Sequence, residues 1–581
     1  MQLLRAEDGL AQLLAQVIRE QCPLDGADAV PPIIFDVPKH MEFGDLTTNI
    51  AMRLAPQLKQ PPVKVAESLI AAARQRLGAV GLEGVVDRLD VKPPGFINIA
   101  FSHQGLVGEL QAIRREREGY GAVPLGSGKR MLIEFVSSNP TGPLSIAHGR
   151  QAAFGDALAR VAAFCGYQAA REYYVNDEGR QITLLGRSIE ARCRQLRGEA
   201  AEVPEDGYRG EYLLDVAKRL PAEAASWLSA ADGTLRFARF GIEEMLRETK
   251  EDLERFGVRF DTWFEQSGLM RSGRLTSALD RLKQQGLLFE DEGAWWFRST
   301  AFGDDKDRVV IKQGGEYTYL SSDIAYHQEK YERGFDQIID IWGPDHHGYI
   351  ARVRASIEAL GHDPARFHVL IVQLTTLFRD GQPVRMSTRA GELVTLKELV
   401  DEVGVDAARF FFLMRKADSH LDFDLKLATE QSPENPVYYI QYAHARIASI
   451  MRFSRNASSQ SHGQQPSDVV EAPRLELLQA VEEQELMRLL CRFPHVVRGA
   501  CRALEPYYVT AYLQELAASF HRFYTRHRVV TDDVARTAAR LVLIDALRVV
   551  LANGLGLLGV GVPERMGRAD EQPEPQAADG R

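Results

Sequence analysis

A loop of small and polar residues carries the first candidate chemistry in this sequence. Residues 137–150 read SSNPTGPLSIAHGR and follow a short apolar run. His148 falls where the next helix is expected to begin, and an imidazole there can donate to phosphate oxygens as charge develops during an adenylyl transfer. Gly142 lets the backbone come close to a phosphate or an adenine. Taken alone, His148 is interpreted equally well as a helix cap.

A second polar loop, far downstream, concentrates positive charge. Residues 380–399 read DGQPVRMSTRAGELVTLKEL and place Arg385, Ser387 and Arg389 in a glycine-flanked stretch just before an expected helix. A basic loop of this kind can close over a triphosphate and stabilise the departing pyrophosphate. A solvated loop is the alternative for this stretch alone. The two loops together, in this order, favour nucleotide chemistry.

Two carboxylates and a tyrosine lie where they are expected to face a site. Glu134 comes late in the apolar run MLIEFV, and Tyr319 and Asp323 are spaced to share one face of a helical turn. Such residues can accept a guanidinium, which needs planar carboxylate acceptors. The alternative is that Glu134 pairs with a structural arginine and that Asp323 caps a helix.

The run DHHG, which contains Asp345, His346 and His347, suggests metal ligands at first sight. Adjacent histidines point apart, however, and no third ligand is spaced to join them. The sequence therefore predicts no metal site at this run.

Strand and helix patterns must position these residues. The apolar run 131–136, a helix over 149–167, a strand over 169–175 and a helix from residue 176 form a βαβ unit, which predicts a parallel sheet. Further strands are expected at 335–343 and 367–375. In such a sheet, ligands bind at the carboxyl ends of the strands, where helix N-termini point. A mostly helical insertion is expected over 180–310, with 294–312 as a β-rich return to the sheet.

The fold class that follows is multidomain α/β, with a Rossmann-like parallel-sheet core between two other units. Residues 1–120 predict a small α+β domain, in which Gly44 and Asp45 make a turn before a helix starting near Thr47 or Thr48. The chain is nearly all helical after residue 405, apart from a polar loop at 456–472. The expected domains are 1–120, 121–375, 376–435 and an all-α helical bundle at 436–566, followed by a disordered tail at 567–581.

Composition restricts the class of protein. The chain has 581 residues, 45% hydrophobic and 26% charged, and a formal net charge of −10. No run of about 18 uninterrupted apolar residues predicts a membrane span, and the charged N-terminus does not resemble a secretion signal. The five cysteines contain no CxxC pair, so buried thiols in a reducing cytoplasm are expected.

The two loops resemble the HIGH and KMSKS signatures of class I aminoacyl-tRNA synthetases. The surrounding sequence is similar to the bacterial arginyl-tRNA synthetase family from about residue 1 to Met566. The stretches that carry this resemblance are IEFVSSNPTGPL, REYYVNDEGRQI, YTYLSSDIAYH, IWGPDHHGY, MSTRAGELVTLKELVDEVGVDAARFF, NPVYYIQYAHARI and FHRFYTRHRV with VLANGLGLLGV.

The resemblance implies an activity and its partners. It implies ATP-dependent ligation of L-arginine to tRNA(Arg) through an arginyl-adenylate, with release of AMP and pyrophosphate. ATP with Mg²⁺ is then a substrate complex, without a protein-bound metal or organic cofactor. The resemblance further implies a cytoplasmic monomer that binds neither DNA nor a membrane.

The resemblance also assigns residues of the candidate site. The residues implied in catalysis are His148, Ser145, Arg385, Ser387 and Arg389. Those implied in ATP binding are Gly142, Pro143, Ala147, His148, Gly149, Asp345, His346 and Met386. Those implied in arginine binding are Glu134, Ser138, Asn139, Tyr319 and Asp323.

A basic and aromatic stretch, HRFYTRHR at 521–528, is a candidate for contact with tRNA. Basic side chains bind phosphates, and aromatic rings stack on unpaired bases. A solvated helix face is the alternative. Tyr442 and Arg446 form an i, i+4 pair that can present a ring beside a cation, and Arg492, Arg498 and Arg502 lie between these stretches. The resemblance implies that the helical region binds the anticodon stem and loop, through Tyr442, Arg446, Arg522, Arg526 and Arg528, and that the N-terminal domain touches the tRNA elbow.

The sequence departs from the two signatures at four positions. Ser145 and Ala147 stand at the first and third positions of HIGH, and Arg385 and Thr388 replace the lysines of KMSKS. A serine cannot carry charge, and losing one phosphate contact typically costs on the order of 3 kcal/mol. A non-catalytic tRNA-binding paralogue is therefore the second hypothesis. A small-molecule adenylyltransferase is a third, which explains neither flanking domain.

Overall fold

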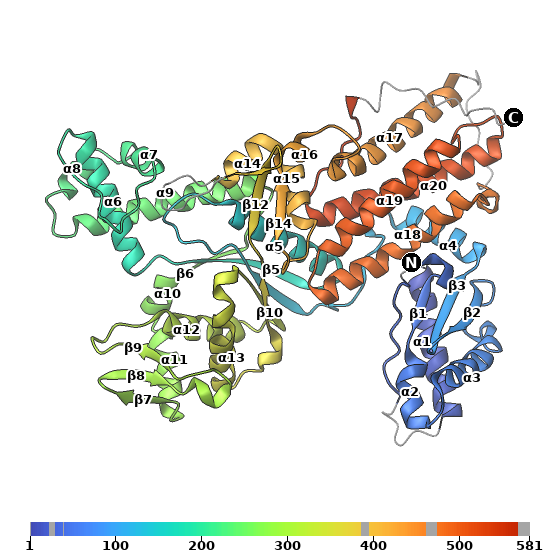
Figure 1. Cartoon of the computed structure of the whole chain (residues 1–581), viewed down its shortest axis with the longest axis horizontal. Coiled ribbons are helices and arrows are strands. Elements are labelled where there is room, and N and C mark those ends of the chain that lie inside the picture. The colour runs from blue at the N-terminus through green and yellow to red at the C-terminus, as the bar shows by residue number, and fades with distance from the viewer. Residues whose placement is uncertain (1, 23–29, 39, 385–393, 461–472, 568–581) are drawn as a thin grey trace.

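The structure is a computed structural model that describes residues 2–22, 30–38, 40–384, 394–460 and 473–567. Figure 1 shows a central α/β region with the N-terminal unit and the C-terminal helices on one side and a helical lobe on the other. The arrangement confirms the predicted fold class, a parallel-sheet core flanked by an α+β unit and a helical region.

The N-terminal unit is a small antiparallel sheet packed against helices. Its described strands are ordered β1-β3-β2. The helix expected from Thr47 or Thr48 begins at Ile50, because Leu46 and Thr48 are paired with Ile99 and Ile97 of β3. The elements are α1 (Gln2–Gln21), β1 (Leu46–Thr48), α2 (Ile50–Leu58), α3 (Pro62–Arg74), β2 (Val86–Lys92), β3 (Phe96–Phe101) and α4 (His103–Glu116).

The central sheet is parallel, with the strand order β11-β10-β4-β5-β6. Strand order reverses between β4 and β10, the place where open α/β sheets bind ligands at the carboxyl ends of their strands. The predicted strands around 131–136, 169–175, 335–343 and 367–375 are all confirmed. The elements are β4 (Arg130–Glu134), α5 (Ile146–Phe164), β5 (Gln168–Val175), β6 (Thr262–Glu265), β10 (Gln337–Trp342), α13 (Ile350–Ala359) and β11 (Phe367–Ile371).

The region expected as a helical insertion contains two different structures. A helical lobe follows β5, after which β6 joins the edge of the central sheet. The predicted return of residues 294–312 to that sheet is wrong, because β8 pairs with β7 and β9 pairs with β8 in a separate antiparallel sheet. The elements are α6 (Arg180–Leu196), α7 (Tyr212–Lys218), α8 (Ala224–Trp227), α9 (Gly233–Arg255), α10 (Gln266–Arg271), α11 (Arg274–Gln284), β7 (Leu288–Asp291), β8 (Ala294–Phe297), β9 (Arg308–Ile311) and α12 (Tyr319–Glu332).

A small sheet and short helices connect the core to the C-terminal helices. Described strands form the order β13-β12-β14. Thr395 and Glu398 form a capping box that begins α14. The elements are β12 (Thr375–Arg379), β13 (Gln382–Pro383), α14 (Leu396–Val403), α15 (Val405–Leu413), β14 (Leu421–Asp424) and α16 (Leu425–Thr429).

The C-terminal helices pack around an apolar helix, α20 (Val534–Leu558). Among the described residues, α20 is the one helix long and apolar enough by length and composition to cross a membrane, and 61% of its most apolar stretch is buried inside the protein. The other helices are α17 (Pro436–Gln460), α18 (Val481–Ala503) and α19 (Tyr507–Arg526).

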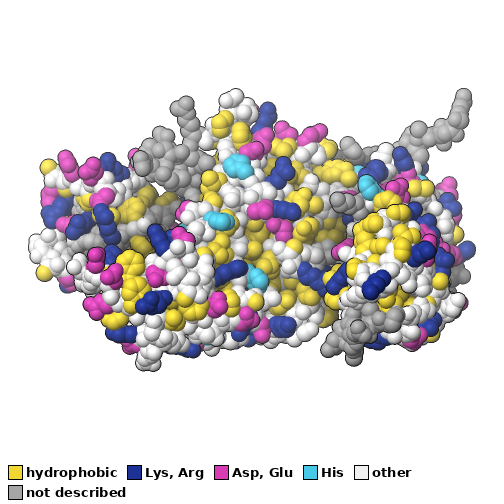
Figure 2. All heavy atoms as spheres, turned by 60° about the horizontal axis from the view of Figure 1, so that its bottom comes forward, with side chains coloured by type: hydrophobic (Ala, Val, Ile, Leu, Met, Phe, Trp, Pro, Cys, Tyr) yellow, Lys and Arg dark blue, Asp and Glu magenta, His cyan; other side chains and the backbone are white. Residues whose placement is uncertain are grey.

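Ion pairs join the N-terminal unit to the C-terminal helices. Arg488 of α18 contacts Asp45 at 2.6 Å, and Arg498 contacts Glu7 of α1 at 2.8 Å. Arg498, one of the three arginines noted between residue 446 and the basic stretch at 521–528, therefore lies in an internal contact. Elsewhere, Figure 2 shows basic and acidic side chains interspersed over the face in view, as expected for a chain of mixed charge.

Each of the five cysteines lies in the described part of the chain and is a free thiol. Four are buried, as expected, and Cys22 is half-buried.

Candidate active site

A cavity of about 620 Å³ opens at the carboxyl ends of β4 and β10, where the strand order reverses. It gathers residues from distant parts of the chain. Those that line it are Glu134, Val136, Ser137, Ser138, Asn139, His148, Gln151, Tyr174, Asn176, Gln181, Gln266, Tyr319, Ser322, Asp323, Ile341, Trp342, Gly343, Asp345, His346 and Tyr349.

A row of carboxylates crosses the sheet beside this cavity. Asp340 of β10, Glu134 of β4 and Glu172 of β5 are register partners on three adjacent strands. Their exposed fractions are 1%, 7% and 0%. Buried charges this close together are strongly destabilising unless cations and hydrogen-bond donors compensate them.

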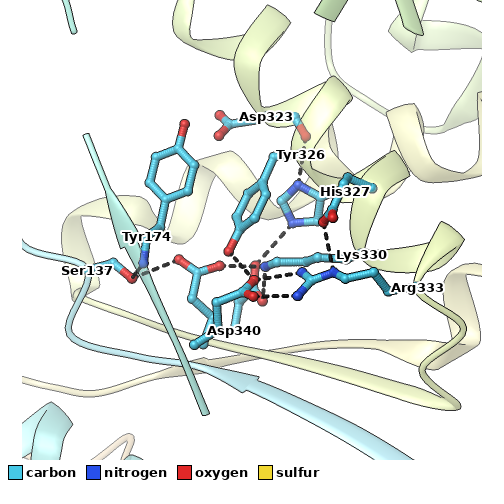
Figure 3. A network of polar contacts seen from close by, with 11 residues as sticks. Ser137, Tyr174, Asp323, Tyr326, His327, Lys330, Arg333 and Asp340 are labelled. Atoms are coloured by element: carbon cyan, nitrogen blue, oxygen red, sulfur yellow. Dashed lines mark hydrogen bonds and ion pairs between the residues drawn. The ribbon is translucent and has the colours of Figure 1, made fainter. Parts of the chain in front are cut away.

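Helix α12 supplies those cations and donors from one face (Figure 3). Lys330 contacts both Glu134 and Asp340, the latter at 2.7 Å, and Arg333 forms two hydrogen bonds with Glu172. The hydroxyl of Tyr326 donates to Glu172 at 2.6 Å. His327 Nε2 lies 3.0 Å from Asp340. Spacings of three, four and seven residues bring these side chains onto the same helix face.

The pKa values show how strongly burial and charge compete here. Burial opposes ionisation of Lys330, but Asp340 and Glu134 outweigh it and raise the pKa of Lys330. Burial also disfavours the charged form of Asp340, but Lys330 and His327 outweigh burial and lower the pKa of Asp340. For Glu134, burial prevails over Lys330 and raises its pKa. Lys330 is therefore a cation at neutral pH.

The same helix presents Tyr319 and Asp323 to the cavity, as the sequence predicts. Asp323 lies inside α12, which begins after Thr318, so the alternative that it caps the helix is wrong. Burial raises the pKa of the Asp323 carboxyl, although His327 and Tyr349 oppose this shift. The sequence also allowed a structural arginine as the partner of Glu134. In the structure, this partner is Lys330 instead.

The loop after β4 turns sharply beside Glu134. Val136 and Ser137 have φ values of 69° and 41°, a left-handed conformation that strains side-chain-bearing residues and is costly for a β-branched one. The Ser137 hydroxyl donates to Glu134 at 2.9 Å and accepts from the backbone N–H of Tyr174 at 3.1 Å. Sequence reasoning missed Ser137, because only the turn aims its hydroxyl at Glu134.

The two residues after Ser137 were predicted as arginine-binding, and both line the cavity. Ser138 Oγ lies 3.0 Å from the hydroxyl of Tyr173. Asn139 Oδ1 accepts a hydrogen bond from Asn176 at 3.2 Å. The amide of Asn139 is thereby held at the rim of the pocket.

His148 combines the two interpretations that its sequence position allows. Ser145 is the N-cap of α5, its hydroxyl accepts from the His148 N–H, and His148 Nδ1 accepts from the Ser145 N–H at 3.2 Å. Burial lowers the pKa of His148 to about 4. The imidazole is therefore neutral at pH 7, with its proton on Nε2, and it lines the cavity. It caps the helix and keeps one donor for a ligand.

The neighbouring glycines pack against protein. A Cβ on Gly149 would lie 2.7 Å from Leu396, and one on Gly142 would lie 3.3 Å from the Tyr212 hydroxyl. Gly142, Pro143, Ala147 and Gly149 are not among the cavity-lining residues, whereas Asp345 and His346 are.

The second basic loop lies outside the described residues, including Arg385, Met386, Ser387, Thr388 and Arg389. Its C-terminal flank meets the first loop directly. The Leu396 N–H donates to the Leu144 carbonyl at 2.8 Å, and Thr395 pairs with Ser145 as an isolated bridge.

Among the described residues, no three histidine, cysteine, aspartate or glutamate side chains gather as a metal site. His346 and Asp345 form a pair at 3.4 Å on the cavity wall.

The residues predicted to contact tRNA have different environments. Arg446 is 4% exposed, and its guanidinium lies on the Tyr524 ring and bonds the Tyr524 hydroxyl at 2.8 Å. The expectation that Arg446 is a presented cation is therefore wrong. Arg522 and Arg526 pair with Glu485 and Glu482 at the surface. Arg528 is exposed, and Tyr442 lies 5.9 Å from the ring of His521.

Comparison with known proteins places this geometry in a class. Residues 110–422 match the family model "tRNA synthetases class I (R), catalytic domain". Residues 8–101 match "Arginyl tRNA synthetase N terminal domain", and residues 440–566 match "DALR anticodon binding domain". The fold and the site are thus those of a class I aminoacyl-tRNA synthetase.

Individual relatives narrow the class to one family. The chain is 46% identical to the arginine–tRNA ligase of Desulfosudis oleivorans over 93% of this chain and 96% of the other. It is 47% identical to that of Syntrophotalea carbinolica, over 92% and 95%. The fold matches the arginyl-tRNA synthetase structure of Thermus thermophilus with a TM-score of 0.72 at 22% identity, covering 96% of this chain and 99% of that one. The chain belongs to the arginyl-tRNA synthetase family.

Proposed function

We propose that this chain ligates L-arginine to tRNA(Arg), using ATP with Mg²⁺ and passing through arginyl-adenylate. The observation that carries the proposal is the single cavity that brings neutral His148 together with the carboxylates of Glu134 and Asp323. A donor for phosphate oxygens and acceptors for a guanidinium then lie in one site. In this proposal the enzyme acts as a monomer in the cytoplasm.

Arginine binds with its guanidinium between Glu134 and Asp323, beside the Tyr319 hydroxyl, in this proposal. Asn139 and Ser138 hold the α-amino end. The arginine carboxylate attacks the α-phosphorus of ATP, and pyrophosphate leaves. The 2′-hydroxyl of the tRNA 3′ end then attacks the mixed anhydride and releases AMP. Neither step needs a covalent enzyme intermediate, so positioning and charge stabilisation supply the catalysis.

The nucleotide end of the cavity is assigned by the same reasoning. The Nε2–H of His148 donates to phosphate oxygens of ATP, and Asp345 and His346 contact the nucleotide. The backbone of the first loop shapes the ATP site at Gly142, Pro143, Ala147 and Gly149. Arg385, Ser387 and Arg389 of the second loop bind the β- and γ-phosphates, and Met386 contacts another part of ATP.

The flanking regions are proposed to hold tRNA. Residues 1–120 contact the elbow, residues 376–435 contact the stem, and residues 436–566 contact the anticodon stem and loop. Exposed Arg522, Arg526 and Arg528 bind phosphates, and Tyr442 contacts a base. Basic side chains at a surface suit this role, because the phosphates of tRNA can replace the groups that these side chains contact in the free protein.

A non-catalytic tRNA binder, the second hypothesis, is not favoured by any described contact. Relatives close to this chain are named arginine–tRNA ligases. The Ser145 hydroxyl caps α5, so serine serves the structure of the loop, and His148 keeps its donor.

Arginine-dependent ATP–pyrophosphate exchange, measured with and without tRNA(Arg), tests the proposal. Exchange that requires arginine supports the enzyme, and Ser145→His then measures what the serine contributes. Tight tRNA binding without any exchange would establish the non-catalytic alternative.

A further inference from the structure

Lys330 is a buried cation that no step of the proposed reaction uses. It is 0% exposed and does not line the cavity. Its ammonium contacts Glu134 and Asp340 and lies 4.3 Å from the centre of the Tyr326 ring. A buried ion pair contributes little net stability over apolar packing of the same volume, so its presence directly behind the pocket calls for another reason.

One reason for a cation here is the position of Lys330 on α12. It follows Asp323 by seven residues, two helical turns along the same face. Lys330 attaches that face to β4 through Glu134 and to β10 through Asp340. Asp323 and Lys330 lie on this one helix (Figure 3), so the attachment also constrains how far the Asp323 carboxylate lies from that of Glu134.

The second reason is the orientation of the Glu134 carboxylate. Lys330 contacts Oε2, and the Ser137 hydroxyl donates to Oε1 at 2.9 Å. With one contact on each oxygen, the plane of the carboxylate is fixed while each oxygen keeps a further lone pair. A guanidinium is a planar, rigid fork that binds best to carboxylates of fixed plane and spacing.

We propose that Lys330 is a positioning residue that determines arginine affinity, by fixing the plane of Glu134 and its separation from Asp323. This inference rests on the proposed function and deepens it, because it assigns guanidinium selection to a side chain that does not touch the substrate. The neighbouring cation Arg333 pairs with Glu172, which does not line the cavity, and it has no such role.

Three full-length variants test this role. Lys330→Met removes the charge at similar volume. Lys330→Met combined with Asp340→Asn also removes the carboxylate left in excess, which restores the charge balance but not the clamp on Glu134. Arg333→Met is the matched control, at the C-cap of the same helix. For each, we would measure arginine binding by equilibrium dialysis, KM for arginine and for ATP in pyrophosphate exchange with tRNA(Arg) present, and Tm.

The expected result separates affinity from stability. Both Lys330 variants should weaken arginine binding and raise KM for arginine by about thirtyfold, the loss of roughly one well-oriented charged hydrogen bond. KM for ATP should stay within about threefold, since the nucleotide end of the cavity is unchanged. The double variant should recover much of the Tm lost by Lys330→Met, whereas Arg333→Met should lower Tm and leave arginine binding unchanged.

Two results would overturn the inference alone. One is recovery of wild-type arginine affinity in the double variant, and the other is an equal loss of arginine affinity in Arg333→Met. Either would make Lys330 a purely structural cation while the wild-type chain still activates arginine. A wild-type chain that neither binds nor activates arginine would instead overturn the proposed function, and this inference with it.

Discussion

Two sets of ion pairs in this molecule use similar residues in opposite ways. Along α12, Lys330 and Arg333 face Glu134, Asp340 and Glu172, all of them buried carboxylates. On the C-terminal helices, the paired side chains of Arg522 and Arg526 remain 50% and 66% exposed.

The difference decides what each set can do. Buried pairs exchange with neither water nor a passing ligand, and removing one partner leaves an uncompensated charge, so they fix geometry. Exposed pairs contribute about 0–1 kcal/mol each and are screened by salt. Arg522 and Arg526 can therefore release Glu485 and Glu482 for phosphates at little cost. One region is organised before its substrate arrives, and the other is open to exchange.

The largest effect is expected from Glu134→Gln, which breaks the buried set at the pocket. The change removes the charged acceptor for arginine and leaves Lys330 facing Asp340 alone, so kcat/KM for arginine should fall by about a thousandfold. Pyrophosphate exchange at varied arginine concentration measures this. A fall below about tenfold would mean that Glu134 does not hold the guanidinium.

His148→Ala tests the nucleotide end of the same cavity. Loss of one preorganised donor to the transferring phosphoryl group should lower kcat for exchange by about a hundredfold, with KM for arginine nearly unchanged. Circular dichroism would control for the loss of a capping contact at α5.

The same residue gives a pH dependence with a defined sign. Burial holds the pKa of His148 near 4, below its ordinary value of 6.5. The unfolded chain therefore takes up this proton first, and the stabilising contribution present above pH 6.5 is lost as the pH falls toward about 4. Chemical denaturation of wild type and His148→Gln across this range should show a smaller pH dependence in the variant.

Arg446→Met tests a buried arginine of the C-terminal helices. The change leaves the Tyr524 hydroxyl without its charged partner and should lower the free energy of unfolding by about 2 kcal/mol. A Tm measurement with tRNA binding checks this. A variant of unchanged stability and weaker tRNA binding would return Arg446 to the surface role first expected from the sequence.

The smallest effects on stability are expected from Arg522→Gln and Arg526→Gln. Each should change the free energy of unfolding by less than about 1 kcal/mol. Each should also weaken tRNA binding a few-fold and reduce its salt slope by about 1. Binding titrations at several salt concentrations measure both quantities. A salt slope equal to that of wild type would exclude a phosphate contact.

Much of the fold and part of the site could be predicted from local pattern. Apolar runs of strand length gave β4, β5, β10 and β11, and the spacing of Tyr319 and Asp323 gave their shared helix face. The placement of residues 294–312 was wrong, because an apolar strand pattern does not say which sheet the strand joins. The expected exposure of Arg446 was wrong, because spacing along a helix does not say which face is buried.

The sequence by itself determined which helices and strands form, and which residue types stand in the two signature loops. Both depend on short-range periodicity and turn chemistry. Only the tertiary structure decided that Asp340, Glu134 and Glu172 are register partners and that Lys330 stands between two of them. Each carboxylate lies in its own apolar run, and nothing local fixes the register between strands. Charges far apart in the chain acquire their partners when the sheet and α12 pack together.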